Sequence, residues 1–140
     1  MVHRFKSRDP FIVRILVFLF LSFTPAWAET PMTAAEFEAF VKDKTLAYAQ
    51  QGRAFGVEQY FADRRVIWAF TDGLCQNGVW YAQGDDICFD YENEAPICWN
   101  FFAQGGGMRA RVLGGDAADD LSVVGETDQH ITCVPPGLGV

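Results

Sequence analysis

The stretch that decides the fold runs from Gly78 to Phe102 and reads GVWYAQGDDICFDYENEAPICWNFF. It contains three short runs rich in aromatic residues, separated by two segments rich in Gly, Asp, Asn and Pro. Short apolar runs bounded by turn-forming residues are typical of β-strands. The stretch therefore predicts three consecutive strands, at about 79–83, 87–91 and 97–103.

The chain on both sides of this stretch supplies one helix and more strands. A capping box at Thr33 and Glu36, followed by apolar residues at helical spacing, predicts a helix from Thr33 to about Asp43. Residues 45–49 could extend the helix or form a first strand, and a break in the apolar stripe favours the strand. Further strands are expected at 56–61, 65–70, 108–113 and 121–124.

The order of these elements indicates the fold class. No helical periodicity appears after residue 50 and the connections are short, which is typical of an antiparallel meander. The predicted class is therefore α+β and mainly β, with the N-terminal helix covering one face or one open end of the sheet. About seven strands can stay an open curved sheet or curl into a small open barrel, and the pattern does not choose between them.

The first 28 residues have the organisation of a cleavable signal peptide. Basic residues precede an apolar core at Ile15–Phe23, which is shorter than the ~20 residues that span a bilayer. Ala26-Trp27-Ala28 fits a cleavage site. We therefore expect residues 1–28 to be a signal peptide and residues 29–140 to be a single secreted, β-rich domain. The expected location is the periplasm, with membrane contact only during export.

The chain is acidic, with 11 Lys+Arg, 18 Asp+Glu and a formal net charge of −7. Removal of the predicted signal peptide leaves 7 basic and 17 acidic residues, a net charge of −10. An acidic protein repels phosphate backbones, which argues against a nucleic-acid partner. The same charge favours solubility and would suit a basic partner protein.

The four cysteines, Cys75, Cys88, Cys98 and Cys133, all lie in the predicted secreted domain. An even number of cysteines in a small exported chain predicts two disulfides. If the second and third strands of the deciding stretch form a hairpin, Cys88 faces Cys98, which leaves Cys75 for Cys133. The pairing of Cys75 with Cys88 and of Cys98 with Cys133 fits a sheet nearly as well.

The sequence offers little chemistry for catalysis or for metal binding. The predicted secreted domain has one serine, Ser122, and one histidine, His130, without a nucleophile elbow. Asp85-Asp86 and the acidic residues at 116–120 match no calcium-loop pattern, and aspartates in turns ordinarily bond their own backbone. We expect no catalytic residue, no metal site and no cofactor.

Aromatic side chains are the most suggestive feature of the chain. Trp and Tyr on a concave sheet can stack sugars or planar molecules, although most such rings fill a core. Neighbours along a strand, such as Trp80 and Tyr81, must point to opposite faces, so some rings should be partly exposed or covered by the helix.

Two adjacent arginines, Arg64 and Arg65, could hold a carboxylate or a phosphate. Local ion pairs with Glu58 or Asp63 are the alternative role for these arginines. The predicted ligand-binding set is Trp68, Trp80, Tyr81, Trp99, Arg64 and Arg65.

Several short motifs are spread over the predicted secreted domain: TxxEF from Thr33, KTLxY from Lys44, GVEQY from Gly56, RRVIW from Arg64, WY at Trp80, CFxY from Cys88 and CWxF from Cys98. Through these motifs the chain resembles a family of small exported alphaproteobacterial proteins of unknown function. The resemblance implies periplasmic residence and a mostly antiparallel sheet, and it carries no known activity. More loosely, the chain looks like the small disulfide-bearing β-barrel inhibitors of lysozyme found in bacterial periplasms.

Two main functional hypotheses follow. The first is a non-catalytic periplasmic binding or envelope-associated domain, whose partner is an unknown small molecule or glycan held by the aromatic residues. The alternative is an inhibitor of a basic cell-wall hydrolase such as lysozyme, guided to its target by the acidic charge. An enzyme with an unrecognised carboxylate site is the least favoured.

The cleavage motif gives a direct prediction about processing. We expect the exported protein to begin at Glu29, because Ala28 completes the Ala-x-Ala pattern. Intact-mass measurement of the protein recovered from the producing cells tests this. A mature form that retains Ile15–Phe23 would contradict it.

Overall fold

The computed structural model describes residues 28–135. Residues 1–27, which hold nearly all of the predicted signal peptide, and residues 136–140 lie outside that range. No helix among the described residues has the length and apolarity needed to cross a membrane. Over this range the elements are α1 (Ala34–Val41), β1 (Thr45–Gln50), β2 (Arg53–Tyr60), β3 (Arg65–Phe70), β4 (Cys75–Gln83), β5 (Asp86–Tyr91), β6 (Ile97–Gln104), β7 (Gly107–Val112), the 3-10 turn η1 (Ala117–Asp119) and β8 (Leu121–Thr127).

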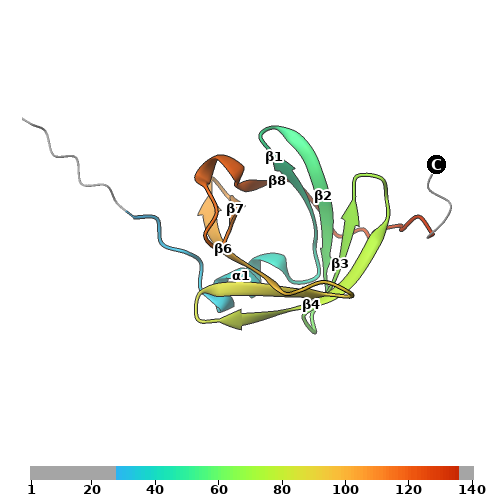
Figure 1. Cartoon of the computed structure of the whole chain (residues 1–140), viewed down its shortest axis with the longest axis horizontal. Helices are drawn as coiled ribbons and strands as arrows, with labels where there is room; N and C mark the ends of the chain where they lie inside the picture. The colour runs from blue at the N-terminus through green and yellow to red at the C-terminus, as the bar shows by residue number, and fades with distance from the viewer. Residues whose placement is uncertain (1–27, 136–140) are drawn as a thin grey trace, which may run out of the picture.

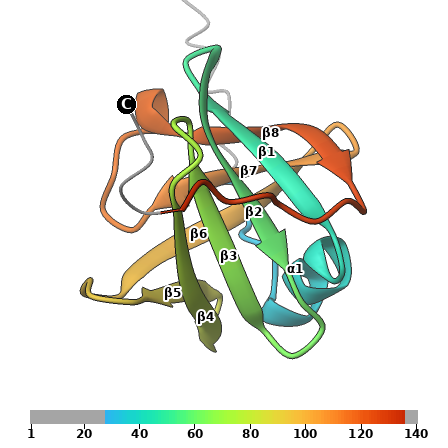
Figure 2. The same cartoon turned by 90° about the vertical axis from the view of Figure 1, so that its right-hand side faces the viewer.

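The eight strands form a closed antiparallel barrel (Figures 1 and 2). Each strand pairs with the next along the chain, and β8 returns to pair with β1, where Thr45 lies opposite Thr127. The predicted mainly-β antiparallel meander with one helix is confirmed. The expectation of an open sheet or open barrel is corrected, because the pairing of the first strand with the last closes the sheet and no local sequence pattern encodes that pairing.

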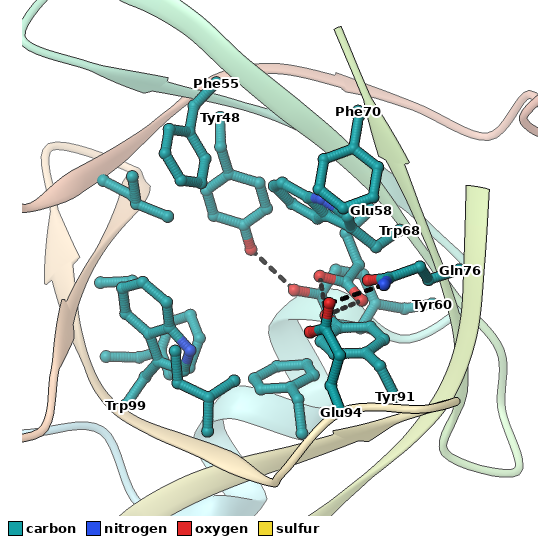
Figure 3. A pocket seen from close by; sticks show the side chains of 15 residues that line it. Tyr48, Phe55, Glu58, Tyr60, Trp68, Phe70, Gln76, Tyr91, Glu94 and Trp99 are labelled. Carbon is teal, nitrogen blue, oxygen red and sulfur yellow. Dashed lines mark hydrogen bonds between the residues drawn. The ribbon is translucent and has the colours of Figure 1, made fainter. Parts of the chain in front are cut away.

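The helix fills one end of the barrel. Its N-terminus is the predicted capping box, in which the Thr33 hydroxyl accepts from the Glu36 N–H and the Glu36 carboxylate accepts from the Thr33 N–H. Phe37 is fully buried, with its ring centroid 5.0 Å from that of Trp80 and 4.4 Å from that of Phe101. Figure 3, a view into the barrel, shows α1 behind the interior side chains.

Several strands differ in extent from the predicted ranges, and one ambiguous segment is resolved. The uncertain segment at 45–49 is a strand, because the chain turns at Asp43, whose φ of 59° no helix accommodates. β4 begins at Cys75 rather than at 79. The polar residue Gln76 belongs to this strand and pairs with Trp68 of β3. β2 and β8 are also a few residues longer than predicted.

The disulfides join Cys88 to Cys98 and Cys75 to Cys133, the pairing that the hairpin register predicts. Cys88 lies directly opposite Cys98 in the β5–β6 ladder, with the two Cα atoms 3.9 Å apart. The second disulfide ties the segment after β8 to the start of β4. That segment runs across the outside of β2 and β3 in Figure 2, and its Ile131 N–H donates to the side-chain oxygen of Gln59.

One ring on the outer face, that of Phe102, is covered by neighbouring arginines rather than by the helix. Phe102 points outward from β6, yet it is only 7 % exposed. The guanidinium groups of Arg109 and Arg111 lie over its ring, at 4.6 Å and 5.6 Å from the centroid. Cation–π contacts of this kind therefore bury an outward ring without a second layer of structure.

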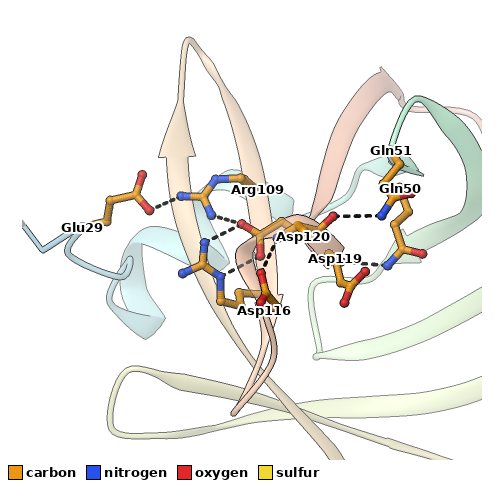
Figure 4. Close-up of polar contacts among 9 residues, drawn as sticks. Glu29, Gln50, Gln51, Arg109, Asp116, Asp119 and Asp120 are labelled. Atoms are coloured by element: carbon orange, nitrogen blue, oxygen red, sulfur yellow. Dashed lines mark hydrogen bonds and ion pairs between the residues drawn. The ribbon is translucent and has the colours of Figure 1, made fainter.

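Two neighbouring strand pairs of the barrel, here called seams, share few backbone pairings, and side-chain bonds hold each pair together. β5 and β6 share three residue pairs and β7 and β8 share two. The disulfide between β5 and β6 holds the first seam. At the second, Asp120 accepts hydrogen bonds from Arg109 and Arg111, and Arg109 also pairs with Glu29 (Figure 4). The hydrogen bond from Arg111, and to a smaller extent that from Arg109, holds the pKa of Asp120 below its usual value.

This ion cluster gives a prediction about stability. Asp120→Asn should lower the free energy of unfolding by about 2–3 kcal/mol, because it leaves two partly buried guanidinium groups short of a counter-charge. The matched control is Asp119→Asn, since the Asp119 side chain is exposed and forms no hydrogen bond or ion pair in the described structure. Urea unfolding of both variants measures the difference. Equal stabilities would show that the cluster does not hold the seam.

Candidate functional site

A cavity of about 220 Å³ lies inside the barrel (Figure 3). Its deep part is lined by Phe89 and Phe101, which pack against Phe37 of the helix. Phe55 and Phe70 line it at the other end and are 39 % and 42 % exposed. The cavity is therefore closed by the helix at one end and reaches solvent at the other.

Aromatic rings form most of the cavity wall. Trp68 of β3 and Trp99 of β6 stand on opposite sides of the space in Figure 3. A wall of rings with few polar groups suits a flat apolar body. The aromatic lining residues are Tyr48, Phe55, Tyr60, Trp68, Phe70, Phe89, Tyr91, Trp99 and Phe101.

One acidic side chain, that of Glu58, belongs to the cavity wall because of the alternation of side chains along β2. Side chains two apart on a strand share a face, so Glu58 points inward together with Tyr60. Glu58 lies opposite Trp68 in the β2–β3 ladder, and Trp68 lies opposite Gln76 in the β3–β4 ladder. The three side chains therefore form a row across the wall. The suggested ion pair of Glu58 with Arg64 or Arg65 is wrong, because the carboxyl is inside the barrel.

Two glycines make room for the rings that surround this acid. A Cβ atom on Gly56 would lie 2.2 Å from the Trp68 indole, and a Cβ atom on Gly78 would lie 2.7 Å from the Tyr91 ring. Neither ring could hold its place beside any other residue type. The glycines therefore set the orientation of Trp68 and of Tyr91, which contacts Glu58.

The Glu58 carboxyl is buried and has a single hydrogen-bond donor. It is 3 % exposed, and the Tyr91 hydroxyl lies 2.7 Å and 2.9 Å from its two oxygens. Burial raises the pKa of Glu58 to about 8, against the opposing effect of the bond from Tyr91. Among the described residues that line the cavity there is no Lys, Arg or His. The carboxyl therefore has no cationic partner.

The remaining polar groups of the cavity bond to one another. The hydroxyls of Tyr48 and Tyr60 are 2.7 Å apart, and burial raises the pKa of both above the usual value, so both stay neutral. Gln76 donates to Glu94 at the rim over 2.8 Å. Glu58 thus differs from the buried tyrosines, which stay neutral, because it can change its charge near neutral pH.

The structure brings together only part of the predicted ligand-binding set. Trp68 and Trp99 line the cavity. Trp80 points inward but lies in the filled end of the barrel under Phe37 and is 2 % exposed. Tyr81 points outward from β4 opposite Cys88. Trp80 and Tyr81 therefore do not contribute to the cavity.

The two arginines of the predicted set lie away from the cavity. Arg64 pairs with Glu38 of α1 over 3.0 Å and stacks over the Trp80 ring at 4.3 Å. Arg65 pairs with Asp63 over 2.7 Å, which is the alternative role predicted for it. Both arginines are therefore occupied by structural contacts that do not involve the cavity.

The residues that sequence reasoning missed are polar members of inward-facing rows, above all Glu58, Gln76 and Tyr91. Their signal is present in β2, where Glu58 shares its face with Gly56 and Tyr60. Identifying that face as the interior requires knowledge of the barrel, because an acid among exposed strands ordinarily marks the solvent side.

The residues that the sequence offers for catalysis or metal binding lie apart from the cavity. No group of three His, Cys, Asp or Glu side chains within residues 28–135 is placed to hold a metal ion. Ser122 and His130 are not among the cavity-lining residues.

Comparisons with known proteins add no identity. No family model matches the chain, and neither a curated protein nor a solved structure is significantly similar to it.

The buried acid predicts an unusual dependence of stability on pH. The folded-state pKa of Glu58 lies above the unfolded value, so folding is favoured by proton uptake at this group. The resulting stabilisation is fully present below pH ~4.5 and is lost as the pH rises through about 8. Relative to Glu58→Gln, the wild-type free energy of unfolding should fall by roughly 3 kcal/mol between pH 5 and pH 8.

Urea unfolding of both proteins across this pH range measures that difference. Glu94→Gln is the control, because it removes an exposed acid at the rim and should leave the wild-type pH dependence unchanged. Parallel pH profiles for wild type and Glu58→Gln would contradict the assignment.

Proposed function

We propose that this protein is an exported, non-catalytic binding protein that holds one small molecule inside its barrel. The observation that carries the proposal is the 220 Å³ of space left among the interior side chains. Eight-stranded barrels are just wide enough for side chains to fill or for one small ligand to occupy. Cores are ordinarily packed without voids of this size, so an unfilled interior that reaches solvent supports a binding role.

The size and lining of the cavity support a particular kind of ligand. An engineered apolar cavity of about 150 Å³ accepts benzene, so about 220 Å³ suits one aromatic ring with substituents, or an aliphatic body of similar bulk. The facing positions of Trp68 and Trp99 favour a flat group between them. The ligand class that fits is therefore a compact, largely apolar molecule rather than an extended glycan.

The proposed location is the periplasm, reached through the signal peptide. Two disulfides form and persist in oxidising compartments, and both are present among the described residues. A binding protein in that compartment would meet small molecules from outside the cell or from the envelope.

A neutral fluorescent probe tests the proposed function. We expect 1-aminonaphthalene, whose emission rises in apolar surroundings, to bind with one site per chain. Ala110→Leu should weaken this binding at least tenfold, because Ala110 lines the cavity and three added carbon atoms would occupy part of it. Ala103→Leu, the same change at an exposed position of β6, should have no effect.

The outcome also separates this proposal from the inhibitor hypothesis. An inhibitor of a basic hydrolase would use its outer surface, so Ala110→Leu would leave salt-sensitive binding to lysozyme intact. Absence of probe binding to the folded protein, or equal binding by the two leucine variants, would overturn the proposed function.

A further inference from the structure

The charge state of the cavity indicates which ligands it rejects and which it can hold. Groups that face Glu58 are Trp68 from β3, Gln76 from β4, Tyr91 from β5 and the Tyr48–Tyr60 hydroxyl pair. None of these groups carries a positive charge. An anionic ligand would find no counter-charge and would face a carboxyl, so anions are disfavoured.

The basic side chains of the described chain do not reach this carboxyl. Seven of them lie within residues 28–135; none of the seven lines the cavity, and five have acidic partners. The ion pairs are Lys44 with Glu126, Arg64 with Glu38, Arg65 with Asp63, and Arg109 and Arg111 with Asp120.

Around the carboxyl the walls offer a second attraction for positive charge. Trp68, Phe70 and Tyr91 line the cavity together with Glu58, and aromatic rings attract cations, quaternary ammonium groups in particular. Phe89 and Tyr91, which also line the cavity, are stacked with their ring centroids 6.0 Å apart. A buried carboxyl beside such rings can stabilise one desolvated cation.

The rim of the cavity carries negative charge, as the ionised Glu58 would. Glu94 is exposed and lines the opening of the cavity, where Gln76 holds its carboxylate. The whole chain carries a net charge of −7. A negative rim on a negative protein raises the local concentration of cations and repels anions.

Resting on the proposed function, we propose that the ligand is an organic cation whose ammonium group pairs with Glu58 while its apolar body lies between Trp68 and Trp99. A ligand of this class supplies the positive charge that the interior lacks. Its apolar body would occupy the remainder of the 220 Å³.

Binding of this kind is coupled to a proton. The carboxyl must ionise to pair with the cation, and burial places the pKa of Glu58 at about 8 in the empty protein. Affinity for a permanent cation should therefore rise about tenfold per pH unit below pH 8 and level off above it. The pKa values of Tyr48, Tyr60 and Tyr91 are raised, so these groups stay neutral over that range, which leaves Glu94 as the other acid near the opening.

A matched pair of probes tests the ligand class. Benzyltrimethylammonium and its neutral carbon isostere, 2,2-dimethylpropylbenzene, have the same shape and differ by one charge. Each is titrated against bound 1-aminonaphthalene at pH 6 and at pH 9. We expect the cation to bind roughly 50- to 100-fold more tightly at pH 9 than at pH 6, and the neutral isostere to bind more weakly than the cation at pH 9, with no such rise.

Two variants assign the effect to the buried acid. Glu58→Gln should abolish both the preference for the cation and its pH dependence while leaving binding of the neutral isostere unchanged within about threefold. Glu94→Gln should keep both, with a small uniform loss of cation affinity. Thermal unfolding and circular dichroism verify that each variant is folded.

The results separate the two proposals. Binding of the neutral probes without preference for the cation at pH 9 would overturn the ligand class and leave the binding function in place. A preference that survives in Glu58→Gln would also overturn it. Failure of all probes to bind the folded wild-type protein would overturn the binding function itself.

Discussion

The structure depends on closure of the sheet between β1 and β8. Closure removes the exposed strand edges that an open meander would present to other chains, and it creates an interior that eight strands leave wide enough for a ligand. The helix fills only the end of this interior, through Phe37 and the rings around it. The cavity is thus a consequence of a plug that reaches part of the way along a closed barrel.

Closure also decides how the polar residues of the strands are used. Once β2 is part of a closed wall, the face of Gly56, Glu58 and Tyr60 must be the interior. A carboxyl there is destabilised by burial unless it binds a proton. The rings of Trp68 and Tyr91 can approach it only because Gly56 and Gly78 lack side chains. Glu58 therefore lowers stability, and two glycines are needed to accommodate the rings beside it. Local departures from stability of this kind are found at functional sites.

The features that the sequence predicts well are those fixed by residues close together in the chain. The capping box joins Thr33 and Glu36, three positions apart, and the Cys88–Cys98 pair follows from the register of a single hairpin. Closure was not predictable in this way, because it pairs Thr45 with Thr127. The same limit applies to the site: Trp68 and Trp80 both point inward, and only the position of Phe37 determines that one lines a cavity while the other is core.

The Glu58 side chain couples the stability of the fold, the uptake of a proton and the binding of a ligand. A carboxyl that must be neutral in the empty barrel lowers stability at alkaline pH, since the folded state then holds an unpaired buried charge. A cation that pairs with it would remove this penalty, so the same ligand would stabilise the fold most at the pH where the empty protein is weakest. A neutral ligand of equal shape would stabilise the fold through contact with the rings alone. The interior acid therefore makes charge, rather than shape, the property by which this barrel can discriminate among molecules small enough to enter it.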